Sequence, residues 1–184
     1  MTDEEFQAAI DMLRSGNKEG LKKIYDSYMK FIYAVIYDTL KNREDAEDIT
    51  SDFFIKLIRV ADAYKSGSGH RMWLATIARN MAIDHIRKNK KEMPQDEWEN
   101  MVESQGDSHS GESQVEDKAV LTEDMRRAMQ TLSPKEKEVV DMKLLGHLKF
   151  KEIAQITGQP MGTVSWLYNQ GISKLRRCLS GYEG

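Results

Sequence analysis

The sequence lacks the features of a secreted, membrane-spanning or disulfide-stabilised protein. Cys178 is the single cysteine in 184 residues, so no disulfide can form within one chain. No apolar stretch approaches the roughly 20 residues that a membrane-spanning helix needs. The start MTDEEFQAAI is acidic where a secretory signal would be basic and then apolar. We therefore expect a soluble protein of the reducing cytoplasm.

Proline and strand-forming patterns are also scarce. The three prolines, Pro94, Pro134 and Pro160, fall in linker or boundary positions, and no segment alternates apolar and polar residues as a strand would. Apolar residues make up 40% of the chain, which is enough for real cores, and they recur at helical spacing. The expected helices cover residues 3–14, 18–41, 43–62, 70–90, 118–131, 134–145, 150–157 and 163–179. The sequence therefore predicts an all-α fold.

Charge is distributed unevenly along the chain. The net charge is -3, but residues 92–120 contain nine Asp or Glu and one Lys, which leaves the remainder weakly basic. The same segment is rich in Ser, Gly and Gln, and it has too few apolar residues to offset the entropy that ordering would cost. We therefore predict a flexible acidic linker over residues 92–120, between small helical domains over residues 1–91 and 121–184.

The sequence LSPKE contains the signature of a helix start. Ser133 can cap a helix that has Pro134 at its first position, and Glu136 can reach back to the amide of Ser133. We expect this helix to stop at Gly146, because glycine is unfavourable within a helix.

Residues 150–177, FKEIAQITGQPMGTVSWLYNQGISKLRR, predict a helix-turn-helix. Ala154 is small where two helices would cross, Gly158 can adopt a positive φ between them, and Val164 would anchor the second helix. We expect Thr163 to cap that second helix. An ordinary helical hairpin with a glycine turn is the alternative, which the spacing alone does not exclude.

In a helix-turn-helix, the second helix enters the major groove of duplex DNA with its first residues at the base edges. The inward apolar stripe would consist of Val164, Tyr168, Ile172, Leu175 and Leu179. The side chains left to face outward, toward base edges, are Thr163, Ser165, Trp166, Asn169 and Gln170. The basic side chains better placed to contact phosphates are Lys149, Lys151, Lys174, Arg176 and Arg177.

The segment WLATIARNMAIDHIRKNKK, residues 73–91, predicts a helix with two contrasting faces. The apolar face consists of Leu74, Ile77, Ala78 and Met81. The polar face consists of Asn80, Asp84, Arg87, Lys88 and Lys91. This polar face indicates a binding site for an anion, although Asp84 could simply form a solvated ion pair with a basic neighbour. Trp73, which opens the helix, is expected in the core rather than on a stacking surface.

Taken together, these motifs resemble the two-domain extracytoplasmic-function type of bacterial RNA polymerase sigma factor. The resemblance covers about residues 18–180. It rests on DAEDITSDFFIKL at 45–57, WLATIARNMAIDHIRK at 73–88 and LSPKEKEVVDMKLLGHLKFKEIAQITGQPMGTVS at 132–165. It implies an alternative sigma factor that binds core RNA polymerase and directs promoter-specific transcription initiation. Such a factor has no catalytic activity, cofactor or metal of its own, and we expect a monomer when it is free.

The resemblance also implies roles for particular segments. The helix that carries Asp45, Glu47, Asp48 and Asp52 would dock on the coiled-coil clamp helices of the polymerase's largest subunit. Without the resemblance, these carboxylates would be interpreted as a solvated acidic face. The loop at residues 61–69 and the helix after it would capture the minus-ten promoter element as a single strand, with bases turned out into pockets. The helix-turn-helix would bind the minus-thirty-five element as a duplex.

The chain departs from the family pattern at a few positions. Ser51 stands where glutamine is common, and Leu167, Gln170 and Ile172 stand where basic residues are common in the recognition helix. These differences bear on the minus-thirty-five sequence that is recognised rather than on the fold. Trp166 could replace part of the contact area through thymine methyl groups, or could contact another domain or an anti-sigma factor.

Two other functions compete with this interpretation. The first is a conventional helix-turn-helix regulator that binds duplex DNA without polymerase. It would not explain the function of residues 18–91. A helical enzyme is disfavoured, because the histidines do not form a metal or nucleophile constellation with Cys178. The histidines are His70, His85, His109 and His147, of which His85 is expected on a helix surface.

Overall fold

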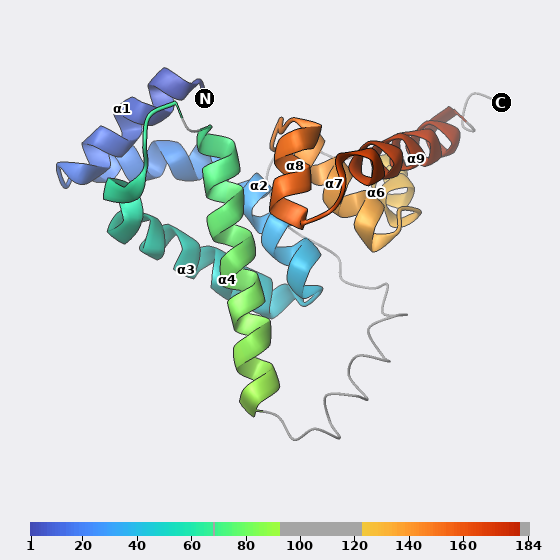
Figure 1. The fold of residues 1–184 in the computed structure, drawn as a ribbon, viewed down its shortest axis with the longest axis horizontal. Coiled ribbons are helices and arrows are strands. Elements are labelled where there is room, and N and C mark those ends of the chain that lie inside the picture. The colour runs from blue at the N-terminus through green and yellow to red at the C-terminus, as the bar shows by residue number, and fades with distance from the viewer. Residues whose placement is uncertain (68, 93–122, 181–184) are drawn as a thin grey trace.

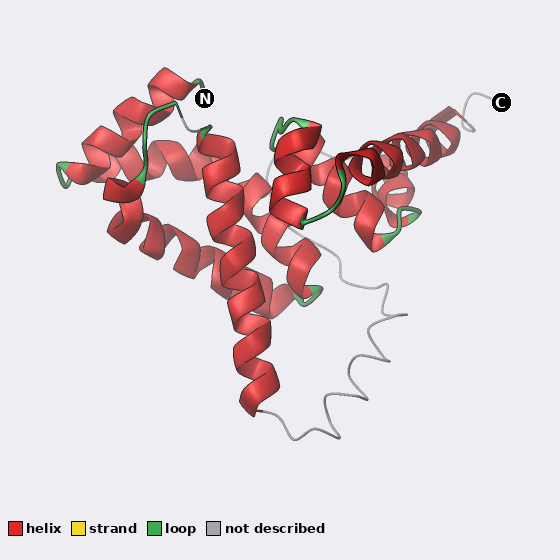
Figure 2. Cartoon of the chain, in the orientation of Figure 1, coloured by secondary structure: helices red, strands yellow, loops and turns green. Residues whose placement is uncertain are grey.

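The computed structural model describes residues 1–67, 69–92 and 123–180, and the rest is drawn in grey (Figure 1). Every regular element in these three ranges is helical (Figure 2). This confirms the predicted all-α fold. Apart from Glu92, the predicted linker at residues 92–120 lies outside the described residues. No helix in the described ranges is both long and apolar enough to cross a membrane.

The N-terminal half contains four α-helices. They are α1 (Asp3–Arg14), α2 (Lys18–Leu40), α3 (Arg43–Val60) and α4 (His70–Glu92), with a 3-10 turn η1 (Ala61–Ala63) after α3. Polar caps explain where three of them begin. Thr2 forms a capping box with Glu5, and the side chains of Asn17 and Asn42 accept hydrogen bonds from the first turns of α2 and α3. Lys41 ends α2 in the left-handed conformation, with φ 56°.

The long helix α2 organises this half, because it packs against α1, α3 and α4. Its inward residues meet the apolar faces of the other helices in one core. Fully buried members of that core are Phe6, Ile10, Ile24, Ile32, Ile36, Phe53, Leu57 and Leu74. The core fixes the orientations of α3 and α4, which carry the predicted docking and minus-ten residues.

The C-terminal half contains α6 (Glu123–Gln130), α7 (Pro134–Leu144), α8 (Phe150–Thr157) and α9 (Met161–Ser180). The capping box of Ser133 and Glu136 is present as predicted, and Gly158 joins α8 to α9 with φ 69°. Thr163 does not cap α9, so that prediction is wrong. The helix begins two residues earlier, because the carbonyl of Pro160 already accepts a hydrogen bond from the amide of Val164 at 3.1 Å.

The two halves lie in contact. Helix α7 packs against α2, and α8 packs against α4 (Figure 1). The main hydrophobic core therefore continues from the N-terminal helices into the C-terminal half, where its buried members include Val139, Met142, Leu148, Ile153 and Val164. A smaller cluster within the C-terminal half is built on Ala128, Leu132, Val140 and Leu175.

Candidate nucleic-acid and protein interfaces

Helix α4 has the two faces that its sequence predicts. Leu74 and Ala78 are fully buried, and Ile77 and Met81 pack against the same core. The opposite face exposes Asn80, Asp84, Arg87 and Lys88 to solvent. The carboxylate of Asp84 lies 3.6 Å from the guanidinium of Arg87, but both side chains are largely exposed, so this pair contributes little stability. Lys91 also belongs to α4, but its side chain lies outside the described part of the structure.

Aromatic packing holds the loop before α4 in place. The ring of Trp73 lies 5.1 Å from that of Tyr64 and 6.4 Å from that of Phe6, measured between centroids. Trp73 therefore belongs to the core, as predicted. The loop contains Gly67 and Gly69, both with positive φ, which other residues rarely adopt.

His70, at the first position of α4, is a structural residue that the sequence did not reveal. Its ring is buried, stacks on Phe6 at 4.6 Å, and hydrogen-bonds to the hydroxyl of Tyr28 and to the carboxylate of Asp3. Burial lowers the pKa of His70, although the carboxylate of Asp3 opposes this effect. The contacts tie the start of α4 to α1 and α2.

The four carboxylates predicted to dock on polymerase differ in their surroundings. Glu47 accepts a hydrogen bond from Arg43 at 2.8 Å, and Asp45 lies 3.3 Å from Nε2 of His85. His85 is therefore half-buried between α3 and α4, not simply on the surface as predicted. In the described ranges no ion pair reaches Asp48 or Asp52, and both are exposed.

Exposed apolar side chains continue this acidic face, and sequence analysis did not identify them. Ile55 and Ile58 on α3 are about half exposed, and so is Tyr25 on α2, whose ring lies 4.8 Å from that of Phe54. Ile55 is three residues beyond Asp52, so the two share one side of the helix. Half-exposed aliphatic residues next to unpaired carboxylates are typical of a surface that binds a partner.

The outward face of α9 is largely open. Thr163, Asn169 and Gln170 are exposed, Ser165 is half-buried, and Trp166 is 58% exposed. The inward stripe is present, with Val164 and Leu175 buried and Tyr168, Ile172 and Leu179 half-buried. Leu167 is also buried, which sequence analysis did not anticipate. Of the three positions where basic residues are common in the family, only Gln170 therefore faces solvent.

The predicted phosphate contacts fall into two groups. Lys149, Lys151, Arg176 and Arg177 are exposed. Lys174 instead donates to a carboxylate oxygen of Glu136 at 2.7 Å, and the amide of Ser133 donates to the same oxygen. Burial would raise the pKa of Glu136, but the hydrogen bonds from Lys174 and Ser133 outweigh it, and the pKa is lowered. Lys174 therefore fastens α9 to the start of α7.

No cluster of His, Cys, Asp and Glu in the described part of the chain is suited to hold a metal ion.

Two family models match the chain in order. Sigma-70 region 2 matches residues 24–92, and Sigma-70, region 4, matches residues 122–175. The chain is 29% identical over 181 residues to the ECF RNA polymerase sigma factor SigW of Bacillus subtilis (strain 168), covering 92% of this chain and 94% of that protein. It is 26% identical over 173 residues to the ECF RNA polymerase sigma factor BldN of Streptomyces coelicolor, covering 92% of this chain and 64% of that protein.

Solved structures share the fold. The sigma factor RpoE in complex with the anti-sigma factor NepR from Bartonella quintana aligns with a TM-score of 0.57 and 21% identity, over 89% of this chain and 98% of that one. CnrH in complex with the cytosolic domain of CnrY aligns with a TM-score of 0.56 and 14% identity, over 96% of this chain and 98% of that one. The matches to regions 2 and 4, and to relatives along most of this chain, establish that the chain belongs to the sigma-70 family as a sigma factor of the extracytoplasmic-function type.

Proposed function

We propose that the chain is an alternative sigma factor that binds core RNA polymerase and directs promoter-specific transcription initiation in the cytoplasm. The observation that carries this proposal is the pair of matches to sigma-70 regions 2 and 4, in that order along one chain. In this proposal the chain is an initiation factor without catalytic activity. Residues 1–91 bind polymerase and the minus-ten element, and residues 121–184 bind the minus-thirty-five element.

Polymerase docking is assigned to the outward face of α3. The carboxylates of Asp45, Glu47, Asp48 and Asp52 would meet basic residues on the clamp helices. Asp48 and Asp52 are four residues apart, which places like charges side by side at a cost of a few tenths of a kcal/mol that a basic partner would remove. The exposed Ile55 and Ile58 would add apolar contact area at the same interface.

Minus-ten recognition is assigned to the polar face of α4. Asn80 is uncharged and can both donate and accept hydrogen bonds, so it would read a base edge. Arg87 and Lys88 would hold phosphates, with Asp84 orienting Arg87 through the ion pair described above. Lys91 would extend this phosphate contact.

Minus-thirty-five recognition is assigned to the outward face of α9. Thr163, Ser165, Asn169 and Gln170 would face base edges, and Trp166 would contact thymine methyl groups or sugar. Phosphates would be contacted by Lys149, Lys151, Lys174, Arg176 and Arg177. For Lys174 this requires that its bond to Glu136 be exchanged for one to DNA.

An anti-sigma factor is a further proposed partner. RpoE and CnrH, which share this fold, were each solved in complex with another protein, and in RpoE that protein is an anti-sigma factor.

Reconstitution with core RNA polymerase tests the proposed function. The purified chain should co-elute with core enzyme in gel filtration, and the mixture should initiate transcription at promoters mapped by overexpressing the chain in its source bacterium. A helix-turn-helix regulator would bind duplex DNA but would not co-elute. Failure to co-elute with core enzyme from the source bacterium would contradict the proposal.

A further inference from the structure

One arginine of α1 holds the start of the loop that joins α3 to α4. Arg14, the last residue of α1, donates from one guanidinium nitrogen to the carbonyl oxygens of Ala61 at 3.0 Å and Tyr64 at 2.9 Å. These carbonyls bracket η1, and the amide of Tyr64 also donates to the carbonyl of Ala61 at 3.2 Å. The guanidinium therefore closes both ends of the single turn that opens residues 61–67, here called the loop segment.

The other contacts of Arg14 place its guanidinium but do not hold the loop segment. Its second terminal nitrogen donates to the carboxylate of Asp11, within α1, at 3.0 Å, and its side chain is only 30% exposed. Its Nε lies 3.5 Å from the carboxylate of Asp62, but the side chain of Asp62 is 92% exposed, so this pair contributes little. The two charge-assisted bonds to carbonyls are therefore the contacts that fix the loop segment.

Close packing fixes α1 itself against α2. A Cβ atom at Gly20 on α2 would lie 2.9 Å from the amide nitrogen of Leu13 and closer still to the carbonyl oxygen of Ala9. Ile10 and Leu13 of α1 are buried, and helices packed at this distance have little room to slide. Arg14 directly follows Leu13, so its guanidinium projects from a fixed support.

Helix α1 also holds the far end of the loop. Phe6 is fully buried, and its ring lies 5.0 Å from that of Tyr64 and 4.6 Å from that of His70, the first residue of α4. Asp3 hydrogen-bonds to the ring of His70. Helix α1 therefore contacts the chain before and after residues 65–67, and Figure 1 shows it running beside the connection from η1 to α4.

Between these anchors the loop segment presents a polar surface to solvent. Ala61 and Tyr64 are buried, whereas its exposed side chains are those of Asp62, Ala63, Lys65 and Ser66. A polar loop without support samples many conformations, and ordering it during binding costs entropy. A loop that is already held in one conformation avoids that cost. The support comes from a helix that precedes the match to sigma-70 region 2, which begins at residue 24.

We propose that Arg14 is a positioning residue for minus-ten recognition, which orders the loop segment before an unpaired base arrives. The proposal rests on the proposed function, because it assumes that this loop and α4 take up the minus-ten element as a single strand. Turning a base out of the stack already costs free energy, so a loop that also had to be ordered would read the element less well. Arg14 acts through the carbonyls of Ala61 and Tyr64 and does not itself touch DNA.

Replacing Arg14 in the reconstituted holoenzyme tests the proposal. Arg14→Met removes the donors but keeps a good helix former. On a panel of single-base minus-ten variants, its preference for the favoured base should fall about fivefold or more at one position, while core-enzyme affinity stays unchanged. Arg14→Lys keeps the charge without the planar fork, so it should recover only part of the preference.

Two control variants should keep the wild-type base preference. Asp11→Asn removes the ion pair of Arg14 within α1 and leaves both carbonyl bonds in place. Lys18→Met removes one cation from an exposed position at the start of α2, close in sequence to Arg14.

Salt dependence separates positioning from direct contact with DNA. If Arg14 held a phosphate, Arg14→Met would weaken melting of all templates alike, and the slope of log affinity against log salt concentration would become shallower by about one. Positioning instead predicts a loss of base preference with an unchanged slope. Three results would each overturn the proposal: wild-type preference in Arg14→Met, a shallower slope with preference kept, or loss of core-enzyme binding.

Amide hydrogen exchange in the free full-length chain tests the ordering directly. The amides of residues 62–67 should exchange about tenfold faster or more in Arg14→Met, with those of α2 and α3 unchanged, because the opening is local. Unchanged exchange in the loop segment would contradict the proposal. If the unmodified chain forms no holoenzyme that melts promoters, the proposed function is wrong, and hydrogen exchange then decides whether Arg14 orders the loop segment.

Discussion

Asp48→Arg should separate docking from folding on α3. Asp48 is exposed, stands four residues before Asp52, and forms no ion pair within the described ranges. Reversal replaces a like-charge pair with an attractive one, and each of these terms is worth about 0.2–0.5 kcal/mol. The free energy of unfolding should therefore stay constant or rise by less than about 1 kcal/mol, as measured by urea denaturation.

The same change should weaken binding to core RNA polymerase. If Asp48 meets a basic residue on the clamp helices, the change removes an attraction and introduces a repulsion, at a cost of about 2–5 kcal/mol. This corresponds to core-enzyme binding that is weaker by about thirtyfold or more, measurable by fluorescence anisotropy of the labelled chain. Glu4→Arg on α1 is the control, with the same charge change at another exposed position. Wild-type affinity in a folded Asp48→Arg variant would refute the docking assignment.

Other changes test the remaining assignments. The Asn80→Ala variant should distinguish correct from incorrect bases less well at one or two minus-ten positions, by about 1–3 kcal/mol. Changing both Arg87 and Lys88 to Ala should weaken the melting of all promoters. The slope of log affinity against log salt concentration should then become shallower by about one to two. Promoter melting by the holoenzyme on single-base variants at several salt concentrations distinguishes them; reversed effects would reverse the roles. Glu136→Ala should destabilise the fold by about 2–4 kcal/mol, because it removes a cap and a charged hydrogen bond, and an unchanged melting temperature would refute this role. Folding lowers the pKa of His70, so the stability that this residue contributes is present above pH 6.5 and is lost as the pH falls. The melting temperatures of wild type and His70→Gln should therefore differ less at pH 5.5 than at pH 7.5.

Most helix boundaries could be predicted because their causes are local. The capping boxes at Thr2 and Ser133 lie within four residues of the helices they begin. The apolar face of α4 follows from spacing alone. The start of α9 was less predictable, since Thr163 and Pro160 are both plausible starting points and only the backbone bond to Pro160 distinguishes them.

Contacts between distant segments could not be predicted in the same way. Arg79 and Glu138 are 59 positions apart, and Asp38 and Lys137 are 99 apart. Charged residues on amphipathic helices normally face solvent, so nothing local distinguishes these four from an ordinary polar face. Lys174 illustrates the same limit, because its bond to Glu136 depends on how α9 crosses α7.

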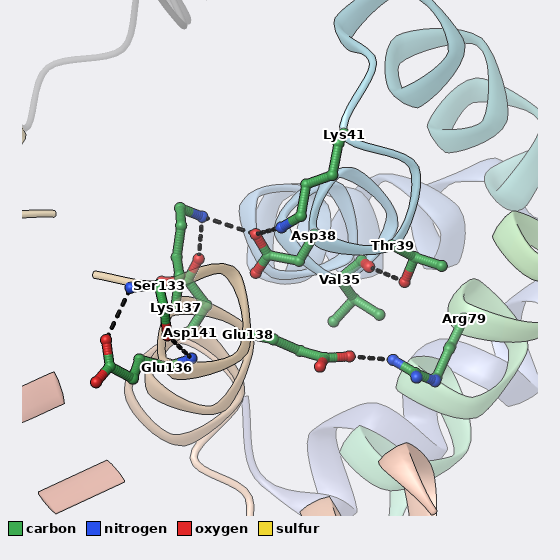
Figure 3. A network of polar contacts seen from close by, with 10 residues as sticks. All are labelled: Val35, Asp38, Thr39, Lys41, Arg79, Ser133, Glu136, Lys137, Glu138 and Asp141. Atoms are coloured by element: carbon green, nitrogen blue, oxygen red, sulfur yellow. Dashed lines mark hydrogen bonds and ion pairs between the residues drawn. The ribbon is translucent and has the colours of Figure 1, made fainter. Parts of the chain in front are cut away.

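The polar network of Asp38, Lys137 and Asp141 between α2 and α7 is incompletely paired (Figure 3). Asp38 and Asp141 compete for Lys137, and the second oxygen of Asp38 accepts no hydrogen bond from the described residues. Burial raises the pKa of Asp141 to about 6; Lys137 acts against this, and Asp38 adds to it. Removing Lys137 would leave the buried carboxylate of Asp141 without its cation, which is strongly unfavourable.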